Sequence, residues 1–100
     1  MAEVICTEPA LLELDAIAEY IDLDNPAAAR HLVQGVFDKT ERFEDFPQSG
    51  RLPPELSDSV YRDVVVPPCR IFYREDEKRV LVLYVMREEQ QLRLYMLENC

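Results

Sequence analysis

The chain has 100 residues and a net charge of −9; 48% of its residues are hydrophobic and 31% are charged. This length fits one domain of residues 1–100 with one modest core, and the hydrophobic content excludes a chain that is disordered throughout. Apolar runs of signal-peptide or membrane-spanning length are absent from the sequence, so we expect a soluble, cytoplasmic protein that does not enter membranes.

The charge is distributed unevenly along the chain. Residues 1–60 hold 13 acids and 4 bases, a balance of −9, whereas residues 61–100 hold 7 of each, a balance of zero. Phosphate binding usually needs a basic footprint, and long-range attraction toward RNA would be weak for this chain. A local basic groove in its second part stays open.

The sequence predicts no metal or cofactor site. Cys6, Cys69 and Cys100 lack any paired metal-ligand spacing, and His31 is the one histidine. We expect Cys6 and Cys69 to be small buried residues and Cys100 to be a free terminal thiol. His31 is expected to be a partly exposed structural residue beside the apolar stripe of its helix, away from the arginines. Two glycines are too few for a glycine-rich phosphate loop.

The first elements are a short strand and a helix. Residues 3–6 predict the strand, Thr7 is a residue type suited to capping the helix that follows, and Pro9 suits the first helical turn. The helix is expected over residues 10–23, because apolar residues recur there at helical spacing. These residues are Ala10, Leu14, Ile17, Ala18 and Ile21.

A second helix is expected over residues 26–45, folded back on the first as a helical hairpin. Asn25-Pro26 supplies a cap followed by a first-turn proline. Its apolar stripe consists of Ala29, Leu32, Val33, Val36, Phe37, Thr40 and Phe43. Periodicity is absent from residues 46–59, where prolines and Gly50 indicate an irregular connection across a functional face.

The remaining residues predict strands. Residues 60–74 contain two runs rich in β-branched and aromatic residues on either side of Pro67-Pro68, which indicates a β-hairpin. Two adjacent prolines require either a cis Pro67-Pro68 bond or a loop wider than two residues. Residues 80–86 are apolar on both sides and should lie inside the sheet, after a polar turn at residues 75–78. Leu92, Tyr95 and Met96 then predict a short C-terminal helix.

This order predicts an α+β fold. An N-terminal strand and a helical hairpin precede a mainly antiparallel sheet of three to four strands, and a short C-terminal helix follows. The helical hairpin should cover one face of the sheet. The other face stays partly open unless the C-terminal helix or a partner covers it. The order of the strands is not determined by the sequence, because the first strand can pair at either side of the hairpin.

Four stretches, taken in their order and spacing over nearly the whole chain, resemble the RelE/ParE superfamily of bacterial toxins from type II toxin-antitoxin modules. They are residues 14–21, Asn25-Pro26-Ala27-Ala28-Ala29, Phe46-Pro47-Gln48-Ser49-Gly50-Arg51, and the strands from Tyr61 through Arg74 to Arg87. The Asn-Pro junction and the Phe-Pro-x-x-Gly-Arg loop are more similar to the ParE branch. That resemblance implies a plasmid-stabilisation-type toxin that inhibits DNA gyrase and growth. It also implies neutralisation by a cognate ParD/RelB-like antitoxin, in a hetero-oligomer with the toxin.

The RelE branch offers an alternative function, ribosome-dependent cleavage of mRNA. Arg70 and Arg87 match two arginine positions of that branch and are therefore the catalytic candidates. The strand that carries lysine there reads Tyr61-Arg62-Asp63-Val64-Val65 here, without lysine, and the position of the aromatic acid-base group falls near Leu92-Arg93. Arginine stays protonated, so it supplies charge stabilisation and no proton acceptor. Enzyme activity is therefore not favoured, and a degenerate protein that only binds its antitoxin is a third alternative.

Tyrosines are the remaining candidates for proton transfer, and we expect them in the core or lining a groove. They are Tyr61, Tyr73, Tyr84 and Tyr95.

Five arginines on the predicted strands and C-terminal segment are the candidate binding residues for an antitoxin, RNA or gyrase. They are Arg62, Arg70, Arg74, Arg87 and Arg93. They form either one cationic groove or ordinary ion pairs with the abundant carboxylates. Both interpretations stand for Arg70 and Arg87, whereas ion pairs are favoured for Arg74 and Arg93. The antitoxin is expected to wrap the helical hairpin and the open sheet with some basic residues, because the helices are acidic.

Overall fold

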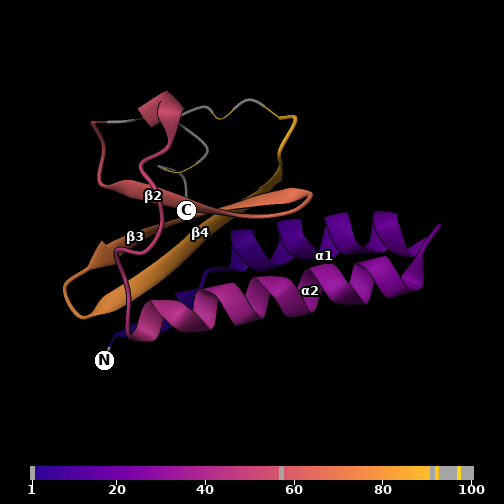
Figure 1. Cartoon of the computed structure of the whole chain (residues 1–100), viewed down its shortest axis with the longest axis horizontal. Coiled ribbons are helices and arrows are strands. Elements are labelled where there is room, and N and C mark those ends of the chain that lie inside the picture. The colour runs from indigo at the N-terminus through magenta and orange to yellow at the C-terminus, as the bar shows by residue number, and fades with distance from the viewer. Residues whose placement is uncertain (1, 57, 91, 93–96, 98–100) are drawn as a thin grey trace.

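A computed structural model describes residues 2–56, 58–90, 92 and 97. Its elements are β1 (Glu3–Cys6), α1 (Glu8–Asp22), α2 (Pro26–Glu41), the 3-10 helices η1 (Arg42–Glu44) and η2 (Pro54–Leu56), β2 (Tyr61–Val66), β3 (Cys69–Asp76) and β4 (Arg79–Arg87). The predicted α+β class is confirmed, with the helical hairpin lying along one face of the sheet (Figure 1). Among the described helices, none combines the length and apolar character needed to cross a bilayer.

The four strands form one sheet in the order β1-β4-β3-β2. β1 runs parallel to β4, and the other two pairs are antiparallel. The strand of residues 80–86 therefore lies inside the sheet, as predicted. β1 lies next to β4, at the edge of the sheet away from β2. The sequence left this position open.

The turns and caps follow the sequence closely. The Pro67-Pro68 bond is cis and the turn has two residues, which confirms the first of the two predicted alternatives. Asn25 caps α2 by accepting a hydrogen bond from the Ala28 amide at 3.1 Å. Thr7 occupies the cap position of α1, but the prediction that its side chain caps the helix is wrong. Its hydroxyl donates instead to the Val82 carbonyl at 2.8 Å, and this hydrogen bond connects the start of α1 to β4.

The main core lies between the helical hairpin and the sheet. Ala10 and Leu14 of α1 and Leu32 and Val36 of α2 are buried against alternate residues of the strands. The strand residues of this core include Val66, Cys69, Ile71, Tyr73, Val80, Val82 and Val85. Cys69 is fully buried as expected, whereas Cys6 is half-buried. Phe37 is 45% exposed, so its place in the buried stripe was wrong, because it lines the outer seam between the helices.

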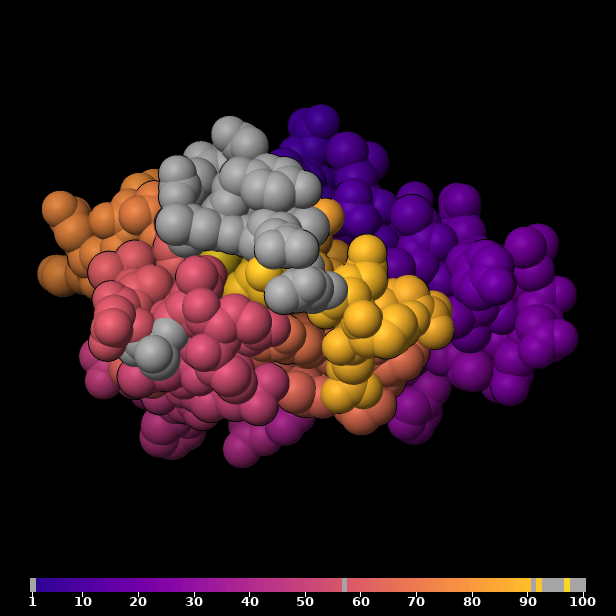
Figure 2. All heavy atoms as spheres, turned by 90° about the horizontal axis from the view of Figure 1, so that it is seen from above, coloured from indigo at the N-terminus to yellow at the C-terminus, as the bar shows by residue number. Residues whose placement is uncertain are grey.

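A second, smaller core lies on the opposite face of the sheet. Phe72, Leu83 and Met86 are buried there together with Leu92 and Leu97. The connection of residues 46–60 and η2 pass over this side (Figure 1), and Figure 2 shows that connection in magenta to pink beside the yellow residues after β4. Leu92, one of the three residues on which the predicted C-terminal helix rests, is buried in this core. The other residues of the predicted C-terminal helix, Tyr95 and Met96, lie outside the described residues.

Candidate functional site

Arg70, on the face of the sheet opposite to the helices, is held by two carboxylates. Its side chain is 8% exposed. Nε and Nη2 donate to Asp63 Oδ2 at 2.9 and 2.8 Å, and Nη1 and Nη2 donate to Glu55 Oε2 and Oε1 at 2.6 and 2.9 Å. The guanidinium carbon lies 4.8 Å from the centre of the Phe72 ring. Carboxylates therefore occupy both hydrogen-bonding edges of this arginine, in the bidentate geometry that arginine favours.

Asp63 links Arg70 to a second arginine. Its side chain is fully buried, and it accepts hydrogen bonds from Arg51 Nε and Nη2 at 2.7 and 3.2 Å. The backbones of Arg51 and Asp63 also pair in both directions at 2.9 Å. Two arginines and two carboxylates balance in charge around the buried side chains of Asp63 and Arg70. Arg51, the arginine of the Phe-Pro-x-x-Gly-Arg loop, therefore connects this loop to β2 through hydrogen bonds with Asp63.

The pKa values of Glu55 and Arg70 are shifted by their mutual hydrogen bonds. Hydrogen bonds from Arg70 lower the pKa of Glu55 from 4.5 to about 2. The same hydrogen bonds to Glu55 raise the pKa of Arg70 further above its usual value. Glu55 is therefore ionised and Arg70 protonated, and neither side chain is suited to exchange a proton during a reaction at neutral pH.

The glycine of the same loop is required by a close contact with Tyr73. The Gly50 amide donates to the Tyr73 hydroxyl at 2.7 Å, and a Cβ atom on Gly50 would lie 2.5 Å from that oxygen. Tyr73 is fully buried and stacks on Phe43 with ring centres 4.0 Å apart. Burial raises the pKa of the Tyr73 hydroxyl. The prediction of a core tyrosine with a satisfied hydroxyl is confirmed for this residue, so Tyr73 is not a group for proton transfer.

Two of the remaining candidate tyrosines, Tyr61 and Tyr84, pack against the second core. Tyr95 lies outside the described residues.

The candidate arginines do not share one groove. Arg87 pairs with Cys69 across the sheet and lies on the helix side, where its Nε donates to Glu89 Oε1 at 2.6 Å. Arg62 lies on the helix side of β2 and donates to the Gly50 carbonyl at 2.9 Å. Arg74 lies with Arg70 on the opposite face, because strand side chains alternate between faces. Of the two alternatives, the structure shows ion pairs for Arg70 and Arg87, and these four arginines do not line one groove. The fifth, Arg93, lies outside the described residues.

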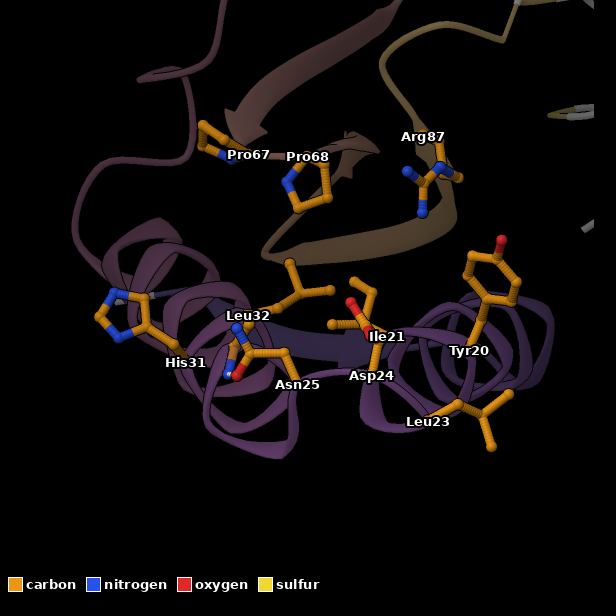
Figure 3. A pocket seen from close by; sticks show the side chains of 11 residues that line it. Tyr20, Ile21, Leu23, Asp24, Asn25, His31, Leu32, Pro67, Pro68 and Arg87 are labelled. Carbon is orange, nitrogen blue, oxygen red and sulfur yellow. Dashed lines mark hydrogen bonds between the residues drawn. The ribbon is translucent and has the colours of Figure 1, made fainter.

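A pocket that sequence reasoning missed lies between the tip of the helical hairpin and the β2–β3 turn. It measures about 900 Å³. In Figure 3, Ile21 and Leu32 point from the helices toward Pro67 and Pro68, and Tyr20 faces Arg87 at one end. Its lining comes from three distant parts of the chain, so no local pattern could have predicted it.

His31 lies on the rim of this pocket and is exposed. Arg87 lines the same pocket. The two residues line opposite ends of the pocket in Figure 3.

Comparison with known proteins identifies the family. The family described as "ParE toxin of type II toxin-antitoxin system, parDE" matches residues 4–92. The chain belongs to the ParE toxin family. The predicted membership of the RelE/ParE superfamily, nearer to its ParE branch, is thereby confirmed. As a toxin of a type II toxin-antitoxin system, this ParE family member implies a cognate antitoxin as its partner.

Two known proteins are similar to this ParE toxin. "Toxin RelE2" of Caulobacter vibrioides is 35% identical over 74 residues, which span 73% of this chain and 80% of the relative. The solved structure "Chromosomal ParDE TA system from P. aeruginosa" superposes with a TM-score of 0.75 and 22% identity, covering 89% of this chain and 98% of that chain. The second likeness shows that the two chains share their fold.

Proposed function

We propose that this ParE toxin acts by binding a protein target, DNA gyrase, and does not cleave RNA. Family membership supports a toxin. The contacts of Arg70 favour binding of a protein target over cleavage of RNA. Arg70 is the arginine on which an RNA-cleaving site would depend, and its side chain is bound to Asp63 and Glu55 instead.

RNA cleavage needs a proton acceptor, a proton donor and cations placed around one phosphate. The two candidate arginines lie on opposite faces of the sheet, so they would not contact the same phosphate. β2 contains no lysine, and Tyr73 is buried in the core. These features support target binding over RNA cleavage.

A ribosome-dependent ribonuclease is the second candidate function, because one relative carries the name "Toxin RelE2". Under this alternative, Arg70→Ala or Arg87→Ala would reduce mRNA cleavage. A protein that binds its antitoxin but has lost toxicity is a third candidate, and growth alone separates it from the other two.

Expression of the toxin from an inducible promoter without its antitoxin tests the proposal. Growth, chromosomal breaks and the integrity of translated mRNA are measured in the same cells. We expect arrested growth, broken DNA and intact mRNA, all reversed when the antitoxin is co-expressed. Cleaved mRNA without DNA breaks would assign the ribonuclease function, and normal growth with verified folded protein would assign the antitoxin-binding function.

A further inference from the structure

The two carboxylates that bind Arg70 differ in where they come from and in how accessible they are. Asp63 belongs to β2, the strand that pairs with the strand of Arg70, and its side chain is fully buried. Glu55 comes from the three-residue helix η2 of the irregular connection, and its side chain is 29% exposed. Asp63 is therefore an internal part of the sheet, whereas the carboxylate of Glu55 lies where water and solutes reach it.

Glu55 covers the outer edge of the Arg70 guanidinium. Nη1 and Nη2 of Arg70 donate to the two oxygens of Glu55 at 2.6 and 2.9 Å. Nε and Nη2 of the same guanidinium donate to Asp63 on the inner side. A phosphate group offers two oxygens to an arginine in the same parallel arrangement as a carboxylate. The carboxylate of Glu55 therefore has the position that two phosphate oxygens would take.

A second arginine lies beside this edge. Asp63 Oδ2 accepts hydrogen bonds from Nη2 of both Arg51 and Arg70, at 3.2 and 2.8 Å. The Arg51 side chain is 52% exposed. Two positive side chains thus meet at one buried negative side chain, and the charge of Glu55 balances the remaining positive charge. Without Glu55, an anion from solution would balance it.

We infer that Arg70 and Arg51 form an anion site that Glu55 occupies from within the chain, and that Glu55 thereby excludes phosphate groups. Asp63 and the Phe72 ring, 4.8 Å from the guanidinium carbon, hold Arg70 in place. Removal of the Glu55 carboxylate therefore leaves a site that is already organised to bind. The inference rests on the proposed function and deepens it, because it names the residue that keeps the phosphates of RNA away from Arg70.

Glu55→Ala opens the site and tests the inference. The Tm of the folded variant is measured by circular dichroism while phosphate replaces chloride at equal ionic strength. Phosphate stabilises proteins in general through its exclusion from their surface, so wild type is the reference. We expect phosphate to raise the Tm of Glu55→Ala by at least about 4 °C more than that of wild type. Glu55→Gln keeps the shape of the side chain, should show a smaller gain, and carries the test if Glu55→Ala does not fold.

A labelled single-stranded RNA oligonucleotide distinguishes the phosphates of RNA from free phosphate. Its binding is followed by fluorescence anisotropy at low salt, where contacts to phosphates are strongest. Glu55→Ala is expected to bind the oligonucleotide at least about tenfold more tightly than wild type does, because phosphodiester oxygens reach Arg70. A response to inorganic phosphate without a gain in RNA binding would overturn the role of Glu55 in excluding RNA.

Matched variants separate the geometry of the site from its charge. Asp76→Ala also removes one carboxylate from an arginine, but its partner Arg79 is 49% exposed and has one carboxylate partner among the described residues. This variant should respond to phosphate as wild type does. Adding Arg70→Lys to Glu55→Ala keeps the positive charge but removes the planar fork, and should abolish the gain. Equal responses of folded Glu55→Ala and wild type would overturn the inference, as would an equal gain in Asp76→Ala.

A failure of this inference differs from a failure of the proposed function. If Glu55→Ala gains phosphate binding but the free wild-type toxin leaves DNA intact, the anion site stands and the gyrase proposal falls. If the free toxin breaks DNA and neither Glu55 variant responds to phosphate more than wild type, the gyrase proposal stands and Glu55 does not occupy an anion site.

Discussion

Arg70 and Arg87 lie on opposite faces of the sheet, although their strands are direct neighbours. Arg87 pairs with Cys69, and Arg70 pairs with Met86, so the two arginines occupy adjacent positions of the ladder with opposite orientation. Because side chains alternate along strands, this offset cannot be removed without a shift of register. The two arginines therefore lie at different surfaces, with Arg70 in an ionic cluster and Arg87 at the pocket between the helical hairpin and the β2–β3 turn.

Removal of the buried carboxylate tests the role of the ionic cluster. Asp63→Ala is expected to destabilise the protein by about 3–5 kcal/mol, because it leaves the buried charge of Arg70 without its inner partner. Urea denaturation followed by circular dichroism measures the change. The exposed pair of Arg79 and Asp76 provides the control, since Asp76→Ala should cost less than about 1 kcal/mol. Similar costs for the two variants would show that the cluster has no special role.

The contact between Gly50 and Tyr73 predicts that the loop does not tolerate a side chain. Gly50→Ala would place a Cβ 2.5 Å from the Tyr73 hydroxyl and 2.8 Å from the Asp63 carbonyl. Overpacking of this kind is expected to cost about 1–3 kcal/mol, measured by thermal or urea denaturation. Gln48→Ala, at an exposed position of the same loop, should change the stability by less than about 0.5 kcal/mol. Wild-type stability of Gly50→Ala would contradict the close packing.

The pKa of Glu55 predicts a pH-dependent contribution to stability. Its pKa is lowered from 4.5 to about 2 in the folded protein, so ionised Glu55 stabilises the fold above pH 4.5 and loses this effect as the pH falls toward 2. The contribution should be about 1 kcal/mol, because the carboxylate is partly exposed and water screens it.

The measurement for Glu55 is the free energy of unfolding of wild type and Glu55→Gln from about pH 7 down to pH 3. The difference between the two proteins should be constant near neutral pH and should shrink below pH 4.5. A difference that grows as the pH falls would have the wrong sign for this account. Glu77→Gln, at an exposed turn position, is the control and should show no such change.

Cys69 is expected to be unreactive in the folded protein. It is fully buried, and burial raises the pKa of its thiol from 9.0 to about 11. Since the thiolate is the reactive form, a thiol reagent at about pH 8 should modify Cys69 only after unfolding. Mass spectrometry of modified peptides distinguishes it from half-buried Cys6 in the same sample. Rapid modification of Cys69 in native protein would contradict its burial.

Sequence patterns predicted the local elements because local rules determine them. The apolar spacing of α1 and α2, the Asn25-Pro26 junction and the Pro67-Pro68 turn each act over a few residues. The position of β1 beside β4 was not predictable in this way, because the pairing of residue 3 with residue 79 joins distant segments. The side chain of Thr7 was misjudged for the same reason, since its acceptor belongs to β4.

The sequence indicated the candidate arginines but not their environment. A signal for the ionic cluster was present, because Asp63 directly precedes three valines and Arg70 lies between Cys69 and Ile71. Charged residues in such strands are rarely buried without a partner. The partners Arg51 and Glu55 come from the irregular connection, and only the tertiary structure brings them to Arg70.

The most direct test of the central claim uses purified gyrase. Supercoiled plasmid, gyrase and ATP are incubated with the toxin, with and without its antitoxin, and the DNA is analysed after protein removal. The account predicts that the toxin alone causes linear DNA to accumulate and that the antitoxin prevents it. Unchanged gyrase activity, together with mRNA cleavage by the same preparation on translating ribosomes, would contradict the account.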